Sequence, residues 1–237
     1  MTTCNNYING AFDSTPNGKE YLKVYNPSTK EEIGQVYLST KEDVDKAVNI
    51  ANNVYHNEWK DLTYKKRIQY LKKLNTLIEA NEVEIANLIV KEHGKNFIEA
   101  LGDVRKGNET VEYAISAPIL MRGYIEEVSN GIQCKDLRSS LGVVVSIVPF
   151  NFPAMVPLWT IPIALMTGNC IILKPSEKVP LTSNYMIQLY KQAGFPDGVI
   201  QVIHGQVDAV NALCDHTLVK AVSFVGSSKV AEIVYQR

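Results

Sequence analysis

Three apolar segments of the sequence end in residues whose side chains could do chemistry. The first segment, 142–148, leads into a turn that carries Asn151 between two prolines. The side-chain amide of an asparagine in such a turn can donate hydrogen bonds to an oxyanion that develops during acyl transfer. It can also satisfy backbone groups of its own turn, which is the commoner role of a loop asparagine. Asn151 therefore has a catalytic and a structural interpretation.

The second apolar segment, 170–173, is followed by a cation and a carboxylate three residues apart, Lys174 and Glu177. An acidic side chain placed after a strand of a dinucleotide-binding sheet can accept hydrogen bonds from the hydroxyls of a ribose. Both residues could instead be solvated loop charges, with Glu177 near the positive N-terminus of the following helix. The pair is a candidate ribose site.

The last apolar segment, 221–225, ends in Gly226 and Ser227 before a helical pattern that starts near Val230. Glycine lets the backbone approach a ligand, and a serine at a helix start offers hydrogen-bond donors where a pyrophosphate binds favourably. The same dipeptide is also a common N-cap. No GxGxxG follows segment 142–148, and residues 226–229 lack the glycine spacing of an NTPase phosphate loop, so the usual nucleotide signatures are absent from these positions.

The cysteines suggest free thiols and no metal site, because none has the CxxC spacing of zinc sites, and four are too scattered for a dense disulfide framework. Cys214 stands two residues before His216. Residues two apart on a helix do not face each other, so a small buried hydrophobe is the better interpretation of Cys214 than a catalytic thiol. A reducing compartment fits these four residues: Cys4, Cys134, Cys170 and Cys214.

The overall composition predicts a globular protein of one large or two small domains, with 237 residues of which 46% are hydrophobic. The chain has 24 basic and 25 acidic residues. Its overall charge therefore gives no attraction to nucleic acid or to an anionic membrane. Segment 139–173 has no charged residue and would be long enough to span a bilayer, but four prolines interrupt it. The first ten residues resemble no targeting signal, so we expect a cytoplasmic protein.

The elements that must position the candidate residues can be recognised from apolar periodicity. Residues 1–39 alternate short apolar runs with turn clusters, and residues 40–118 have helical spacing that starts with Thr40 as a capping residue. Segment 124–137 is extended around Asn130-Gly131, which favours a hairpin turn. Four buried strands then alternate with helical patterns at 154–168, 182–193 and 207–214; these strands are 142–148, 170–173, 199–203 and 221–225.

This alternation predicts an α/β fold with a doubly wound parallel sheet, whose strand ends hold the ligand. The expected divisions are 1–123 as an N-terminal segment with a helical layer, 124–138 as a hairpin, and 139–237 as the sheet. No internal repeat or low-complexity linker separates them.

Taken together, the motifs resemble the cofactor domain of the aldehyde dehydrogenase superfamily, and the resemblance covers essentially the whole chain. Phe150, where a tryptophan is commoner, makes the chain most similar to the CoA-acylating methylmalonate-semialdehyde branch, in its N-terminal portion only. The motifs that carry the resemblance are Tyr7-Ile8-Asn9-Gly10, Glu92-His93-Gly94-Lys95, Pro149-Phe150-Asn151-Phe152-Pro153, Lys174-Pro175-Ser176-Glu177, Ile203-His204-Gly205-Gln206 and Phe224-Val225-Gly226-Ser227.

The resemblance implies a Rossmann-like NAD-binding domain with an oligomerisation hairpin, and with the catalytic domain and its nucleophilic cysteine absent from this chain. Asn151 would be the oxyanion donor, and Lys174 and Glu177 would hold the adenosine ribose. The other residues implied at the NAD site are Val148, Phe150, Lys178, Phe224, Gly226 and Ser227.

The implied reaction is NAD-dependent oxidation of methylmalonate or malonate semialdehyde to an acyl-CoA by a homo-oligomeric enzyme, with the chain inactive alone. One departure affects the substrate: Lys106 stands where this branch has an arginine for the substrate carboxylate, and lysine is not an equivalent bidentate partner. The alternative function is an NAD-binding module without turnover.

Overall fold

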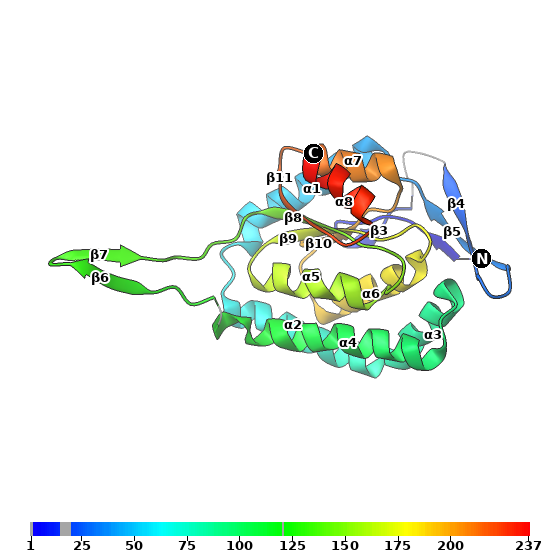
Figure 1. Cartoon of the computed structure of the whole chain (residues 1–237), viewed down its shortest axis with the longest axis horizontal. Coiled ribbons are helices and arrows are strands. Elements are labelled where there is room, and N and C mark those ends of the chain that lie inside the picture. Colours follow the sequence, from blue (N-terminus) through cyan, green and yellow to red (C-terminus); the bar gives the residue numbers. More distant parts are fainter. Residues whose placement is uncertain (1, 15–19, 120) are drawn as a thin grey trace.

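A six-stranded sheet forms the centre of the molecule in a computed structural model that describes residues 2–14, 20–119 and 121–237 (Figure 1). The strand order is β11-β8-β9-β10-β2-β3, and the first four of these strands run parallel. They are β8 (Val143–Ile147), β9 (Cys170–Lys174), β10 (Ile200–Val202) and β11 (Val219–Phe224). The chain adds β9 and β10 on one side of β8 and then β11 on the other. This confirms the predicted doubly wound parallel sheet.

The predicted four-stranded sheet was too small, because two short N-terminal strands extend it. These are β2 (Tyr7–Ile8) and β3 (Ala11–Phe12), and β2 pairs antiparallel with β10. Two-residue strands are too short to show the alternation by which a strand is recognised. The rest of the N-terminal segment forms a separate sheet with the order β1-β5-β4, made of β1 (Thr2–Cys4), β5 (Glu32–Tyr37) and β4 (Tyr21–Tyr25).

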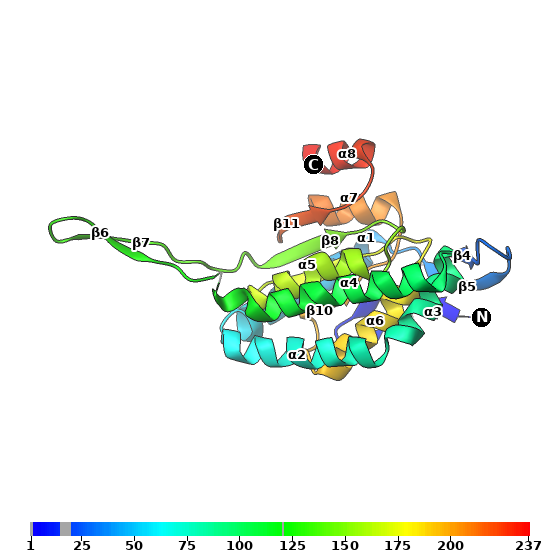
Figure 2. The ribbon, with the colours of Figure 1, turned by 60° about the horizontal axis from the view of Figure 1, so that its bottom comes forward.

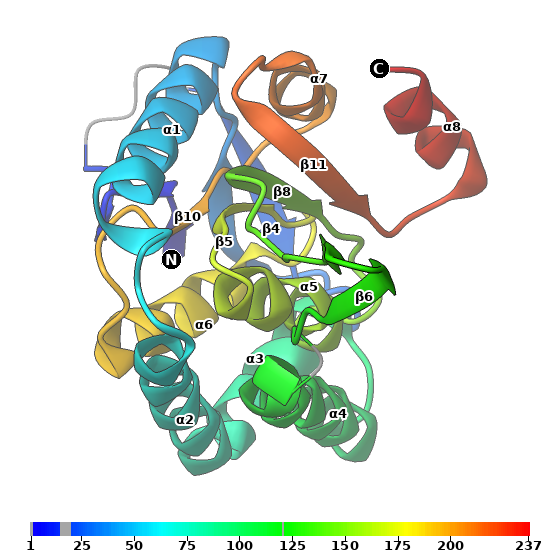
Figure 3. The same cartoon turned by 90° about the vertical axis from the view of Figure 1, so that its left-hand side faces the viewer.

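Helices cover both faces of the central sheet, so every residue of β8 and β9 is buried. One face carries α1 (Lys41–Val54) and α7 (Val207–Asp215), and the other carries α5 (Met155–Met166) and α6 (Pro180–Ala193) (Figure 3). The final helix is α8 (Ser228–Gln236), which has no buried residue. The predicted capping box of α1 is present, since the side chain of Thr40 accepts from Asp43 and Asp43 accepts from the Thr40 backbone.

The predicted helical layer packs outside α5 and α6 (Figure 2). It consists of α2 (Tyr64–Ala80), α3 (Glu82–His93) and α4 (Phe97–Ser116), followed by the short 3-10 helix η2 (Ala117–Ile119). Between α1 and α2 the chain forms a π-helix, η1 (Tyr55–Trp59), which the sequence pattern did not predict.

The hairpin predicted at 124–137 extends away from the body of the molecule (Figure 1). It pairs β6 (Ile125–Ser129) with β7 (Ile132–Lys135), and all nine strand residues are exposed. In the part of the chain that the structure describes, no helix has both the length and the apolar character needed to cross a bilayer. The division of the chain at residues 123 and 138 stays a prediction.

Candidate functional site

The ends of strands β8, β9 and β11 bring the candidate residues to one edge of the sheet. Ile147 of β8 is in register with Lys174 of β9 on one side and with Phe224 of β11 on the other. Val148, directly after β8, is buried and donates its backbone N–H to the oxygen of Lys174 (3.2 Å). The three turns that follow these strands are therefore neighbours in space.

Asn151 is exposed beside an open cleft of about 560 Å³. Within the described residues its side-chain amide has no hydrogen-bond partner, whereas its backbone oxygen accepts a hydrogen bond from Lys95 Nζ (2.8 Å). The amide therefore does not satisfy its own turn, and it remains available to a ligand in the cleft. The cleft is lined by His93, Lys95, Glu99, Gly102, Asp103, Lys106, Asn151, Phe152 and Met155.

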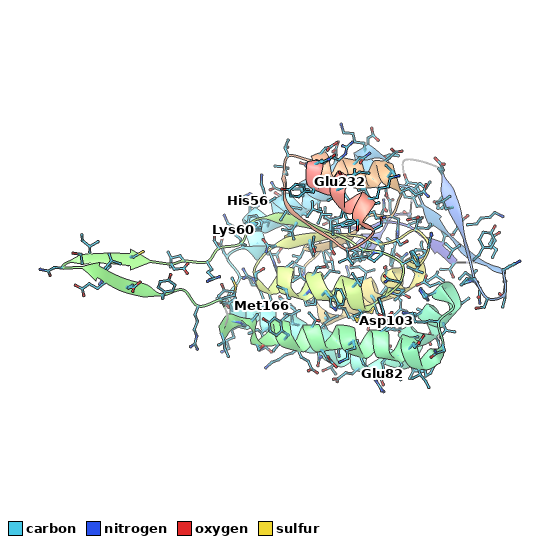
Figure 4. The ribbon with its side chains drawn as sticks, viewed as in Figure 1. His56, Lys60, Glu82, Asp103, Met166 and Glu232 are labelled. Carbon is cyan, nitrogen blue, oxygen red and sulfur yellow. The ribbon has the colours of Figure 1, made fainter. Side chains whose placement is uncertain are left out.

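Lys95 and Asp103 form a buried ion pair beneath this turn, with 3.0 Å between Nζ and Oδ2. Asp103 also accepts the backbone N–H of Met155 (2.7 Å), and Figure 4 places Asp103 between α4 and α5. Burial raises the pKa of Asp103, and its hydrogen bonds and Lys95 oppose that shift. This pair was not predicted from the sequence, where Lys95 is only part of the motif Glu92-His93-Gly94-Lys95 and the one available signal is a carboxylate eight residues after the lysine.

Lys174 and Glu177 lie together at the end of β9, with 3.9 Å between Nζ and Oε2. Lys174 is only 5% exposed, and its ammonium group donates to the backbone oxygen of Gly205 (3.1 Å). Burial lowers its pKa, and the carboxylate of Glu177 opposes this effect. Lys174 is therefore no solvated loop charge, and a buried ammonium group with further hydrogens to donate is suited to a polar ligand.

His204 lies near Lys174 and was missed by the sequence analysis as a site-supporting residue. It is fully buried, and its Nε2 is 2.7 Å from Asn184 Oδ1, while Nδ1 has no partner among the described residues. Burial and the positive charge of Lys174 lower the pKa of His204 to about 3. The imidazole is therefore neutral and adds no second positive charge behind Lys174.

Phe150, Glu177 and Lys178 line a second cleft of about 570 Å³, and His93 lines both this cleft and the Asn151 cleft. The ring of Phe150 stacks on His93 with centroids 6.2 Å apart, and Lys178 Nζ lies 4.7 Å from the Phe150 centroid. Three of the expected NAD-site residues thus share one cleft. Neither Gly226 nor Ser227 lines it.

Gly226 and Ser227 lie on the other side of β8, in the turn between β11 and α8. A Cβ atom on Gly226 would come within 2.5 Å of the Phe224 ring, so a larger residue at this position would require that ring to move. Ser227 is the N-cap of α8, yet its side chain makes no capping hydrogen bond, and the first turn contains no acidic residue. A hydroxyl and helix N–H groups are therefore open to an anion.

Lys106 and its neighbour Arg105 point to different places. Lys106 lines the Asn151 cleft and pairs with Glu109 (3.0 Å), where both side chains are exposed. Arg105 instead forms two hydrogen bonds with Glu82. Of these two cations, Lys106 lines the cleft and Arg105 does not.

None of the four cysteines lines the Asn151 cleft. Cys4 and Cys170 are fully buried, and burial raises the pKa of Cys4 to about 12 and also that of Cys170. Cys214 is half-buried, and Cys134 is exposed on the hairpin. Over residues 2–14, 20–119 and 121–237, no three His, Cys, Asp or Glu side chains gather as a metal site would require.

Comparison with known proteins places this architecture in a family. The aldehyde dehydrogenase family pattern matches residues 14–237. Malonate-semialdehyde dehydrogenase 1 of Geobacillus kaustophilus is 44% identical over 237 residues, which is 100% of this chain and 48% of the relative. Malonate-semialdehyde dehydrogenase of Lacticaseibacillus casei is 42% identical over 238 aligned residues, and the match covers 100% of this chain and 48% of that relative.

Solved structures agree with these relatives. The crystal structure of methylmalonate-semialdehyde dehydrogenase from Oceanimonas doudoroffii has a TM-score of 0.96 and 40% identity, and the match covers 100% of this chain and 48% of that one. The NAD⁺ complex of aldehyde dehydrogenase from Bacillus cereus has a TM-score of 0.94 and 31% identity, and the match covers 99% of this chain and 48% of that one. This chain spans about half the length of the relatives that it matches. It belongs to the aldehyde dehydrogenase family.

Proposed function

We propose that the protein serves the NAD-dependent oxidation of methylmalonate semialdehyde or malonate semialdehyde to an acyl-CoA. The reaction would pass through a thioester on a cysteine that the four thiols of this chain do not supply. The observation that carries the proposal is the side-chain amide of Asn151, which has no partner among the described residues and borders a cleft at the strand ends. The names of the relatives support the choice of substrate class and of CoA as acyl acceptor.

In this proposal Asn151 acts on the substrate and not on the cofactor. When a thiolate attacks the aldehyde carbonyl, the oxygen becomes negative, and the Asn151 amide donates a hydrogen bond to it. A donor that is already in place strengthens as charge develops, which lowers the barrier. Lys106, on the same cleft, would attract the substrate carboxylate as a point charge and without bidentate geometry.

The residues of the sheet edge fit NAD as the cofactor. Lys174 and Glu177 would bind the hydroxyls of the adenosine ribose, and Ser227 with the start of α8 would bind the pyrophosphate. NAD, when bound, supplies the two-electron oxidant for the aldehyde. The remaining residues proposed to line its site are Val148, Phe150, Lys178, Phe224 and Gly226.

We further propose a cytoplasmic homo-oligomer in which the hairpin β6–β7 contributes to the subunit interface. The supporting observation is that the hairpin exposes large apolar side chains on a segment without a partner in the described chain, which is typical of interaction surfaces. These side chains are Tyr124, Ile125, Val128, Ile132 and Leu137.

The test compares wild type with Asn151→Ala in the longest natural form of the protein that contains this sequence. Rapid-quench measurement of acyl-enzyme formation from malonate semialdehyde should show a loss of about a hundredfold or more, with NAD affinity unchanged. Normal acylation by Asn151→Ala would refute the assigned role.

One observation favours the alternative of an NAD-binding module without turnover, namely that no thiol of this chain lines the Asn151 cleft. Residues 1–237 alone should therefore produce no aldehyde-dependent NADH, with or without CoA. A CoA-dependent signal from this chain would contradict that expectation and would require one of its four cysteines to act.

A further inference from the structure

The turn that carries Asn151 is held from beneath by a single ammonium group. Lys95 Nζ donates to the backbone oxygen of Asn151 (2.8 Å) and lies 4.3 Å from the centroid of the Phe152 ring. The Lys95 side chain is only 8% exposed. Two successive residues of the turn are therefore fixed by the same buried cation.

The carboxylate that neutralises Lys95 is also the N-terminal cap of α5. Asp103 Oδ2 pairs with Lys95 Nζ at 3.0 Å, while Oδ1 accepts the backbone N–H of Met155 at 2.7 Å. Helix α5 has no cap of its own, because its N-cap residue is Ala154. Asp103, from α4, thus fixes the end of the turn and Lys95 fixes its centre.

Stability alone does not explain such a pair. The Asp103 side chain is fully buried and that of Lys95 nearly so, and removing two charges from water costs as much free energy as their attraction typically returns. Among the described residues, the further side-chain contacts of the pair are made to the segment from Asn151 to Met155. What the pair specifies is the position of that segment.

We infer that the Lys95–Asp103 pair is a positioning device that holds the Asn151 turn with its side-chain amide facing the cleft. The inference rests on the oxyanion role proposed for Asn151. With its backbone oxygen bound by Lys95, the peptide that follows Asn151 is held in one orientation, and this fixes the direction in which the side chain leaves the backbone. Lys95 contacts neither of the strand-end residues proposed for the ribose, so NAD binding should not depend on it.

Four variants of the longest natural form test this inference: Lys95→Met, Lys95→Arg, Asn151→Ala, and the double variant Lys95→Met/Asn151→Ala. Displacement of a catalytic group by about 1 Å can cost up to about a hundredfold in rate, so Lys95→Met should lower the acylation rate by about tenfold to a hundredfold. The KM for NAD should stay unchanged. Lys95→Arg, which keeps a buried cation and its donors, should recover part of the rate.

The double variant separates positioning from a general structural effect. If Lys95 acts through Asn151, Lys95→Met should cause little further loss once Asn151 is already alanine. Lys91→Met, at an exposed lysine near the end of α3, is the matched control and should leave the rate unchanged.

The outcomes are distinguishable. The inference would be overturned, and the proposed function left intact, if the losses in acylation rate of the two single variants multiply in the double variant. A normal acylation rate for Lys95→Met while Asn151→Ala is impaired would have the same consequence. A normal rate for Asn151→Ala, or no acylation by wild type, would overturn the proposed function and the inference with it. If Lys95→Met fails to fold, the comparison of Lys95→Arg with wild type decides. A Lys95→Arg variant that keeps the wild-type melting temperature and NAD binding but forms the acyl-enzyme more slowly supports positioning. A Lys95→Arg variant that loses acylation and NAD binding together would count against it.

Discussion

Two buried side chains should give this protein opposing pH dependences of stability that cancel in the wild type. Glu92, at the end of α3, is 3% exposed and accepts the backbone N–H groups of Leu181 (2.7 Å) and Thr182 (2.9 Å) at the start of α6. Burial raises its pKa from 4.5 to about 7, in spite of these hydrogen bonds. The folded chain therefore holds a proton that the unfolded chain has lost, and stability falls as pH rises from about 4.5 to about 7.

His204 acts in the opposite direction. Its pKa falls from 6.5 to about 3 because of burial first and the charge of Lys174 second. The stability associated with the neutral imidazole is present above about pH 6.5 and is lost as the pH falls towards 3. Between pH 4.5 and 6.5 each residue contributes a slope of up to about 1.4 kcal/mol per pH unit, with opposite signs. The two slopes are equal in size near the middle of this interval, where they cancel.

A substitution of either residue should reveal how the free energy of unfolding depends on pH when only the other residue contributes. Urea unfolding of residues 1–237 at about pH 5 and about pH 6 gives the free energy of unfolding at both values. Relative to wild type, the free energy of unfolding of Glu92→Gln should rise by about 1 kcal/mol between the two pH values, and that of His204→Gln should fall by about as much. Comparing slopes removes the direct, pH-independent cost of each substitution. If both variants ran parallel to wild type, neither group would titrate as its burial requires, and the reasoning would be refuted.

Three further predictions concern the cofactor site, a helix cap and the thiols. In the longest natural form, Glu177→Gln should weaken NAD binding by about 1–3 kcal/mol in calorimetry, since it loses a charged acceptor for the ribose, and an unchanged affinity would rule the assignment out. Thr40→Ala should reduce the free energy of unfolding of the chain by about 1 kcal/mol through loss of the α1 capping box, checked by urea unfolding. With a thiol reagent, Cys134 should react at once in the native chain, and Cys4 and Cys170 only on unfolding; fast native labelling of Cys4 would contradict its burial.

Local signals in the sequence were enough to predict most of the elements. Within the helical spacing predicted for residues 40–118, helix α2 was predictable because its apolar residues recur regularly and Thr63 caps it. Strands β8 and β9 were predictable because they are buried on both faces and are mostly apolar. The prediction that all four parallel strands are buried was wrong for β11, which lies at the edge of the sheet and is only partly buried. The π-helix Tyr55–Trp59 was not predicted, since nothing in a short polar and aromatic segment distinguishes its hydrogen bonding from that of the helix before it.

The candidate site was only partly predictable for a different reason. Lys174 ends β9, and Asn151 and Glu177 lie in the turns after β8 and β9, so their common edge follows from the topology. The groups that support them come from distant parts of the chain: Lys95 reaches the Asn151 turn across 56 residues, and Lys174 reaches Gly205 across 31. Periodicity carries no information on such contacts.

The pairing of β2 with β10 has a consequence for synthesis on the ribosome. Next to this pair, the N–H of His204 donates to the side chain of Asn6, 198 residues earlier in the chain. At about 5–20 residues per second, the N-terminal strands would wait about 10–40 s before their partner strand is made. The helices α2 to α4 contact one another locally and can form in that time. Residues near Asn6 should therefore join the sheet only after β10 has been made, and a nascent chain halted before β10 should expose them to added protease.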